Sequence, residues 1–83
     1  MQLNILYFAW LRERIGLAKE QVETEAKTVA DLITELSARE ERYRVAFQDM
    51  TVVKVAIDQV LTPLDTPLAG AKEVAFFPPM TGG

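Results

Sequence analysis

The sequence contains no cysteine and no histidine. The lack of cysteine excludes a disulfide, a thiol nucleophile and a thiolate metal ligand. The lack of histidine removes the commonest general base and the commonest metal ligand. We therefore expect no metal site, and we expect any chemistry to depend on another group. A chain without disulfides also fits a reducing compartment.

Long apolar runs and clustered basic residues are also missing. The longest apolar run is far shorter than the about 20 residues that cross a bilayer, and the first residues lack the basic start and cleavage site of a signal peptide. We therefore expect a cytoplasmic protein with no membrane contact. Nine basic residues stand against twelve acidic ones, for a net charge of −3. This balance disfavours nucleic acid, which needs clustered lysine and arginine, and suits a protein partner with a basic surface.

Hydrophobic residues make up 49% of the 83 residues, which is enough for one small domain. Residues 2–9 are apolar on one face and mostly apolar on the other, which predicts a strand in the middle of a sheet, covered on much of both faces. Residues 19–25 predict a weaker strand whose flanking charges are typical of a sheet edge. Further strands are expected at residues 51–57, 60–61 and 73–77.

The clearest helix begins at Thr28. Thr28 and Asp31 resemble a capping box, and the apolar residues that follow recur at helical spacing on one stripe. Residues 37–44 are highly charged and either continue this helix or begin a second one, with Glu40 and Arg44 spaced to form an ion pair. The residues of the apolar stripe are Val29, Leu32, Ile33 and Leu36.

The order of these elements indicates a fold class. A short helical turn at residues 10–15, ended by Gly16, separates the first two strands. The whole order is then strand, strand, helix, strand, short strand, strand. One amphipathic helix can cover one face of a mixed sheet of four to five strands. We therefore predict an α+β protein of β-grasp, or ubiquitin-like, type over residues 1–77.

Residues 78–83, Pro-Pro-Met-Thr-Gly-Gly, are predicted to form an extended C-terminal tail. Pro78 and Pro79 have no backbone N–H and fix φ near −65°, so they end the strand's hydrogen bonding and send the chain out as a stiff arm. Six extended residues reach about 20 Å. Gly82 and Gly83 have no side chains, so the tail can enter a tunnel that side chains would block.

The terminal carboxylate of Gly83 is the candidate reactive group. A carboxylate with a pKa of about 3.5 is ionised at neutral pH and is a poor acylating agent. Activation by ATP to an acyl-adenylate would make it reactive, and a second nucleophile would then displace AMP. Sulfide would give a thiocarboxylate, whereas a lysine amine would give an isopeptide. The residues alone leave a carrier, a protein modifier and a plain interaction module open.

Residues 73–83 closely resemble the C-terminal signature of the small, sulfur-carrying subunit of molybdopterin synthase. The match covers Glu-Val-Ala-Phe-Phe-Pro-Pro-Met-Thr-Gly-Gly, and weaker matches extend it over nearly the whole chain. The weaker matches are Tyr7-Phe8-Ala9, Arg12-Glu13, Gly16, Thr28-Val29, Asp65 and Pro67-Leu68.

This resemblance implies a ubiquitin-like fold and a tail that works inside a partner. An ATP-dependent activating enzyme would adenylate Gly83, and sulfur transfer would convert it to a thiocarboxylate. The tail would then donate sulfur to cyclic pyranopterin monophosphate in the large subunit of the synthase. Two small subunits would flank a dimer of large ones, and the small subunit would bind no cofactor itself. The residues that would thread the partner's pocket are Pro78, Pro79, Met80, Thr81 and Gly82.

Two further residues are predicted to contact the partner. Phe77 should face away from the helix-covered side of the sheet, and Arg12 lies in the short helical turn near the first strand. A thiamine-pathway sulfur carrier, another ubiquitin-like carrier and a protein modifier remain alternatives, because all share the fold and the Gly-Gly end. The other carriers tend to be shorter and to lack Phe-Phe-Pro-Pro.

Overall fold

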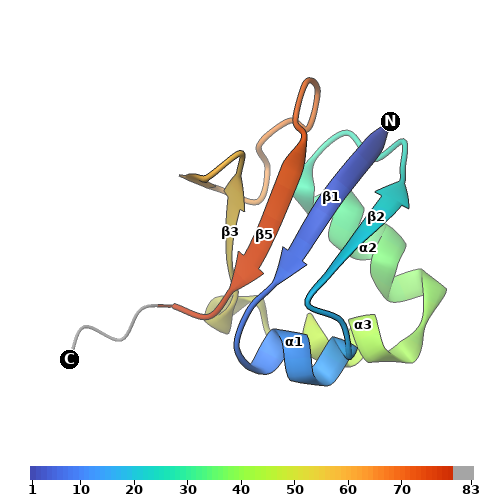
Figure 1. Ribbon diagram of the computed structural model, residues 1–83, viewed down its shortest axis with the longest axis vertical. Helices are drawn as coiled ribbons and strands as arrows, with labels where there is room; N and C mark the ends of the chain where they lie inside the picture. Colours follow the sequence, from blue (N-terminus) through green and yellow to red (C-terminus); the bar gives the residue numbers. More distant parts are fainter. Residues whose placement is uncertain (80–83) are drawn as a thin grey trace.

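The computed structural model describes residues 1–79. Four strands, three α-helices and one 3-10 helix precede a final strand, which leads into the C-terminal residues (Figure 1). In chain order the elements are β1 (Gln2–Tyr7), α1 (Trp10–Ile15), β2 (Lys19–Glu23), α2 (Val29–Arg39), α3 (Glu41–Ala46), the 3-10 helix η1 (Met50–Val52), β3 (Lys54–Ile57), β4 (Val60–Thr62) and β5 (Glu73–Phe77).

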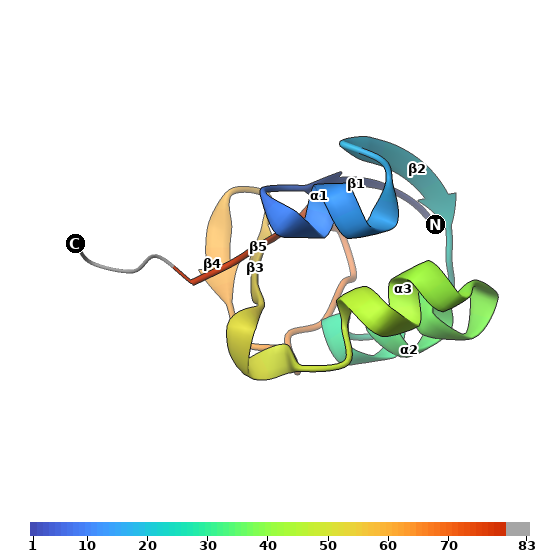
Figure 2. The same cartoon turned by 90° about the horizontal axis from the view of Figure 1, so that it is seen from below.

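The strands form one mixed five-stranded sheet in the order β2-β1-β5-β3-β4. The first and last strands, β1 and β5, are parallel neighbours in the middle of the sheet, and the other neighbouring strands are antiparallel (Figure 1). Helices α2 and α3 lie together on one side of this sheet (Figure 2). This arrangement confirms the predicted β-grasp fold. Within residues 1–79, no helix has the length and apolar character needed to cross a bilayer.

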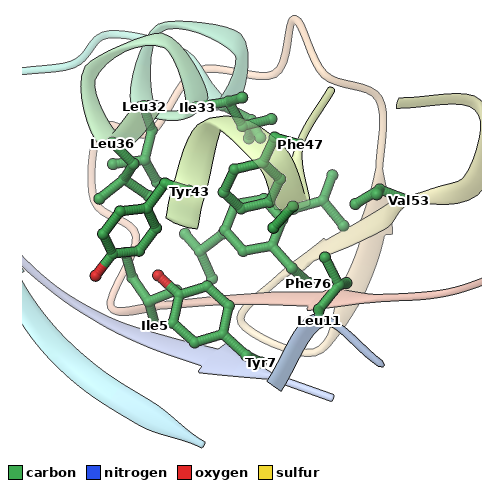
Figure 3. Close-up of a cluster of buried hydrophobic side chains, with 14 of the residues drawn as sticks. Ile5, Tyr7, Leu11, Leu32, Ile33, Leu36, Tyr43, Phe47, Val53 and Phe76 are labelled. Carbon is green, nitrogen blue, oxygen red and sulfur yellow. The ribbon is translucent and has the colours of Figure 1, made fainter. Parts of the chain in front are cut away.

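The hydrophobic core lies between the sheet and the helices (Figure 3). Phe76 of β5 is fully buried, and its ring packs against Phe47 at 4.9 Å and against Tyr7 at 6.0 Å between centroids. Tyr43 and Phe47 are 3% and 5% exposed, so they anchor the charged segment after α2 to the core. Burial of these large rings stabilises the position of β5, from which the tail leaves.

A polar cluster fixes α3 to the sheet. The hydroxyl groups of Tyr7 and Tyr43 both donate to one carboxylate oxygen of Glu20, at 2.8 and 2.6 Å. These bonds join β1, β2 and α3, because each residue belongs to a different element. The pKa of both tyrosines is raised, mainly by burial and secondly by the hydrogen bond to Glu20. The pKa of Tyr43 is raised to about 12. Both hydroxyls therefore remain protonated donors at neutral pH.

The sheet is covered on one face, and the expectation that β1 is covered on much of both faces is wrong. Leu3, Ile5 and Tyr7 are buried, whereas Asn4 is exposed. Leu6, on the same face as Asn4, is half-buried. The helices all pack on the other side, because the connections after β1 and β2 turn toward that side (Figure 2). The uncovered face is called the open face below.

The predicted strand at residues 51–57 begins too early. Residues Met50–Val52 form η1, and β3 starts only at Lys54. The Asp49 carboxylate accepts hydrogen bonds from the backbone N–H and the hydroxyl of Thr51, at 3.0 and 2.5 Å. This local cap overrides the strand preference of the β-branched residues that follow it.

The charged segment after α2 forms a second helix, which settles the alternative left open by the sequence. The helix α2 ends at Arg39, and α3 follows after Glu40. The predicted ion pair between Glu40 and Arg44 is wrong. Arg44 pairs with Glu41 at 2.9 Å, and Glu40 pairs with Arg42 at 2.8 Å. The break at Glu40, whose φ of −148° is extended, removes the helical spacing on which that prediction rested.

Candidate functional site

The candidate site begins where β5 ends. The backbone N–H of Phe8 donates to the carbonyl of Phe76 at 3.0 Å, and Phe77 is paired with Lys54 of β3. Pro78 has no N–H, so this hydrogen bonding ends after Phe77. Pro78 and Pro79 are half-buried and lead away from the carboxyl end of β5 (Figure 1). We call Phe77, Pro78 and Pro79 the tail root.

The predicted reactive residue and most of the threading residues lie outside the described part of the chain. These are Gly83, together with Met80, Thr81 and Gly82. Pro78 and Pro79, which precede them, are placed by the structure at the end of a central strand. Because β5 has a hydrogen-bonded neighbour on each side, the origin of the tail is held firmly by the sheet.

The turn between β3 and β4 fixes the beginning of β5. Asp58 and Gln59 have φ values of 47° and 72°, which are typical of a two-residue hairpin turn. The Asp58 carboxylate accepts hydrogen bonds from the backbone N–H groups of Lys72 and Glu73, at 3.1 and 2.9 Å. Asp58 therefore positions the start of the strand that carries the tail.

Exposed apolar side chains share the open face with the tail root. Phe77 is half-buried and lies on the face opposite Phe76, as predicted from strand alternation. Phe8 is 46% exposed and Leu61 is 66% exposed, and both are large apolar residues. We call Phe8, Leu61 and Phe77 the root surface. Clustered exposed apolar residues of this kind mark a protein interface.

Sequence reasoning found Phe77 but missed Phe8 and Leu61. Alternation along β1 places Phe8 on the face opposite Tyr7, so a signal was present. For Leu61 the signal is the pairing of β4 with β3, in which Leu61 stands opposite Ala56 and therefore on the open face. That pairing becomes visible only in the folded sheet, because it depends on the register of the hairpin.

The structure places Arg12 at the same end of the molecule as the tail root. Helix α1 starts at Trp10, directly after the carboxyl end of β1, and Gly16 ends it with a φ of 86°. Arg12 is exposed, and no salt bridge within residues 1–79 involves it. Its guanidinium is therefore available for a carboxylate of a partner.

The exposed side chains around the tail root are mainly apolar. Within residues 1–79, no group of three or more acidic side chains is placed to hold a metal ion. The root surface is apolar, and the nearest ionisable groups on it, such as Lys54, are exposed. The geometry is suited to presenting a narrow chain end to another protein.

A β-grasp sheet whose central last strand runs into a Pro-Pro segment, followed in the sequence by Gly-Gly, defines a ubiquitin-like protein. The model of the ThiS family matches residues 5–83. The chain belongs to the ThiS family.

Curated relatives agree with this assignment. The molybdopterin synthase sulfur carrier subunit of Escherichia coli is 37% identical over 81 residues, with 98% of this chain and 99% of the relative covered. The protein of the same name from Haemophilus influenzae has the same identity and the same coverage. The resemblance found in the sequence is thereby confirmed at the level of the family.

Solved structures agree with the fold. SAMP1 of Haloferax volcanii has a TM-score of 0.78 and 22% identity, with 100% of both chains covered. A chain in the complex of subunits 1 and 2 of molybdopterin-converting factor from Helicobacter pylori has a TM-score of 0.64 and 20% identity, again with 100% of both chains covered. At these identities the likeness concerns the fold.

Proposed function

We propose that this chain is the sulfur-carrier subunit of a molybdopterin synthase. The observation that carries the proposal is the identity of 37%, over nearly the whole length, with proteins of that name. The structure supports it with a firmly held central strand that leads directly into the tail. The proposed reactive group is the carboxylate of Gly83, and the carrier binds no cofactor of its own.

The proposed chemistry has three steps. A carboxylate oxygen of Gly83 attacks the α-phosphate of ATP on an activating enzyme, and pyrophosphate leaves. Sulfide attacks the acyl carbon, AMP leaves, and the C-terminus becomes a thiocarboxylate. The sulfur is then donated to cyclic pyranopterin monophosphate, and water restores the carboxylate. The use of ATP supports a cytoplasmic location.

The proposed partners are the large subunit of the synthase and the activating enzyme. The word "subunit" in the relatives' names and the two-subunit complex that contains a protein of this fold support a large-subunit partner. We propose two small and two large subunits in the assembly. Phe77 and Arg12 would contact the large subunit beside the tail, and we add Phe8 and Leu61 because they share the exposed root surface.

Deletion of Gly83 tests this function directly. The full chain, incubated with the activating enzyme, ATP and a sulfide source, should gain the mass that corresponds to replacement of one oxygen by sulfur. The chain without Gly83 should gain no sulfur and should support no molybdopterin formation with the large subunit. Its melting temperature should stay unchanged, because the terminal residue follows the packed domain.

Two outcomes would contradict the proposal. An unchanged mass of the full chain, under conditions that charge an established carrier, would exclude sulfur loading. A large drop in melting temperature on deletion of Gly83 would show a structural role for the tail. Copurification with a thiazole synthase would favour a thiamine-pathway carrier, and Gly83-linked lysine adducts on other proteins would favour a modifier.

A further inference from the structure

A groove of about 350 Å³ lies on the helix side of the tail root. Its walls come from α1 on one side and from the end of α3 and η1 on the other. Val45 and Val52 are 37% and 41% exposed, although both are apolar. The residues that line the groove include Trp10, Arg14, Val45, Asp49 and Val52.

The two walls of the groove are next in sequence to the two strands that flank β5, because α1 follows β1 and η1 precedes β3. Trp10 follows Phe8 by two residues, and the N–H of Phe8 is bonded to the carbonyl of Phe76. Val52 precedes Lys54 by two residues, and Lys54 is paired with Phe77. The groove and the tail root therefore lie at one end of the molecule, the end that faces the viewer in Figure 2.

The groove carries one basic and one acidic side chain, those of Arg14 and Asp49. The Arg14 guanidinium lies over the Trp10 ring, 5.4 Å from its centroid, and takes part in no salt bridge within residues 1–79. The carboxylate of Asp49 is already bound to the hydroxyl and the N–H of Thr51, which lowers its pKa. The groove thus offers apolar walls and an exposed guanidinium that no salt bridge within residues 1–79 engages, so an external carboxylate can bind it beside the Thr51-bound Asp49.

We propose that this groove receives an apolar side chain and a neighbouring carboxylate from the large subunit. This inference rests on the proposed function. Because β5 is central, a pocket that encloses Pro78 and Pro79 approaches both faces of the sheet at once. The partner then meets the root surface on the open face and the groove on the helix side. Tryptophan and arginine are the residue types most enriched among the energetic centres of interfaces.

The test measures binding of the full-length, uncharged carrier to the purified large subunit by isothermal titration calorimetry. Arg14→Glu replaces the cation by an anion, which would repel the partner's carboxylate. We therefore expect the dissociation constant of the complex to rise about tenfold or more. Lys27→Glu is the matched control. It makes the same change of charge at an exposed site in the connection before α2, at the opposite end of the molecule (Figure 1). The control should change the constant less than about threefold.

A second variant tests the apolar wall. Val45→Lys places a charge in the groove at an exposed position, so the fold should persist with an unchanged melting temperature, while binding should weaken by about tenfold. If Arg14→Glu and Val45→Lys both bind the large subunit as tightly as the wild type, the inference is overturned. The inference is also overturned if either variant impairs loading by the activating enzyme but leaves binding to the large subunit unchanged.

The failure of this inference can be told apart from the failure of the proposed function. If the wild-type chain neither binds the large subunit nor gains sulfur at Gly83, the function itself is wrong. If the wild type does both and the two groove variants match it, only the groove assignment is wrong.

Discussion

The two faces of β5 each carry a phenylalanine, but the two side chains differ in burial. Phe76 is fully buried among aromatic rings under the helices, whereas its neighbour Phe77 is half-buried on the open face beside the tail. Both are phenylalanines in one strand, and only the direction of the side chain differs. The covered face stabilises the domain, and the open face leaves apolar area for a partner.

This difference extends across the sheet. On the covered face, Leu3, Ile5 and Tyr7 of β1 are at most 1% exposed. On the open face, Phe8 and Leu61 keep about half or more of their surface in water. An exposed apolar surface that adds no packing to the domain supports the proposed contact with the large subunit.

Replacing Phe76, on the covered face, by alanine should have the largest effect on the free energy of unfolding. Removal of a fully buried aromatic ring that contacts Phe47 and Tyr7 should lower the free energy of unfolding by about 3–5 kcal/mol. Urea unfolding followed by circular dichroism would measure the loss. A loss below about 1 kcal/mol would show that the core repacks and that the two faces differ less than the structure indicates.

The neighbouring change, Phe77→Ala, should act on binding instead. We expect the affinity for the large subunit to fall by about 2 kcal/mol, the size of an interface hot spot. The free energy of unfolding should fall less than for Phe76→Ala, because the Phe77 ring is half-exposed. Calorimetric titration and urea unfolding of the same sample provide both numbers. Equal effects of the two substitutions on stability would remove the distinction between the faces.

The smallest effect should come from the polar cluster on the covered face. Tyr7→Phe removes one of the two hydroxyls bonded to Glu20 and should cost about 1.5 kcal/mol of unfolding free energy, since Tyr43 still satisfies the carboxylate.

The pH dependence checks the same cluster. Because the pKa of Tyr7 and that of Tyr43 are raised in the folded state, the unfolded chain loses these protons first as the pH rises above about 10. Stability should therefore be fully present below pH 10 and fall above it. Tyr7→Phe should make that fall shallower in urea titrations at pH 9 and pH 11. If the stability of Tyr7→Phe falls with pH as steeply as that of the wild type, the Tyr7 hydroxyl does not contribute to the pH dependence.

Local patterns predicted the elements well where a single segment decides the outcome. Thr28 caps α2 by accepting the N–H of Asp31 at 3.2 Å, and Gly16 ends α1 in the left-handed region, both as expected. The errors arose where one local interaction or one distant contact overrides the pattern. The cap by Asp49 replaced the start of a strand, and the break at Glu40 removed the spacing of the expected ion pair between Glu40 and Arg44.

The candidate site was only partly visible in the sequence. Its tail and Phe77 follow from the order of residues at the end of the chain, because prolines, glycines and strand alternation act locally. The root surface also needs Leu61, which reaches the open face through the register of β4 against β3. The groove needs Trp10 and Val52 to meet across the molecule, although 42 positions in the sequence separate them.

The amino-acid order alone determined most of the strands and helices, and that the hydrogen bonding of the last strand ends at two prolines. Periodicity, capping and the covalent geometry of proline operate within a few residues, so no distant contact is required. The tertiary structure alone decided which face of the sheet stays open. It also decided that an apolar groove, with an arginine that forms no salt bridge among residues 1–79, lies near the tail root. These features depend on how the helices pack against the sheet, and packing joins residues that no local pattern relates.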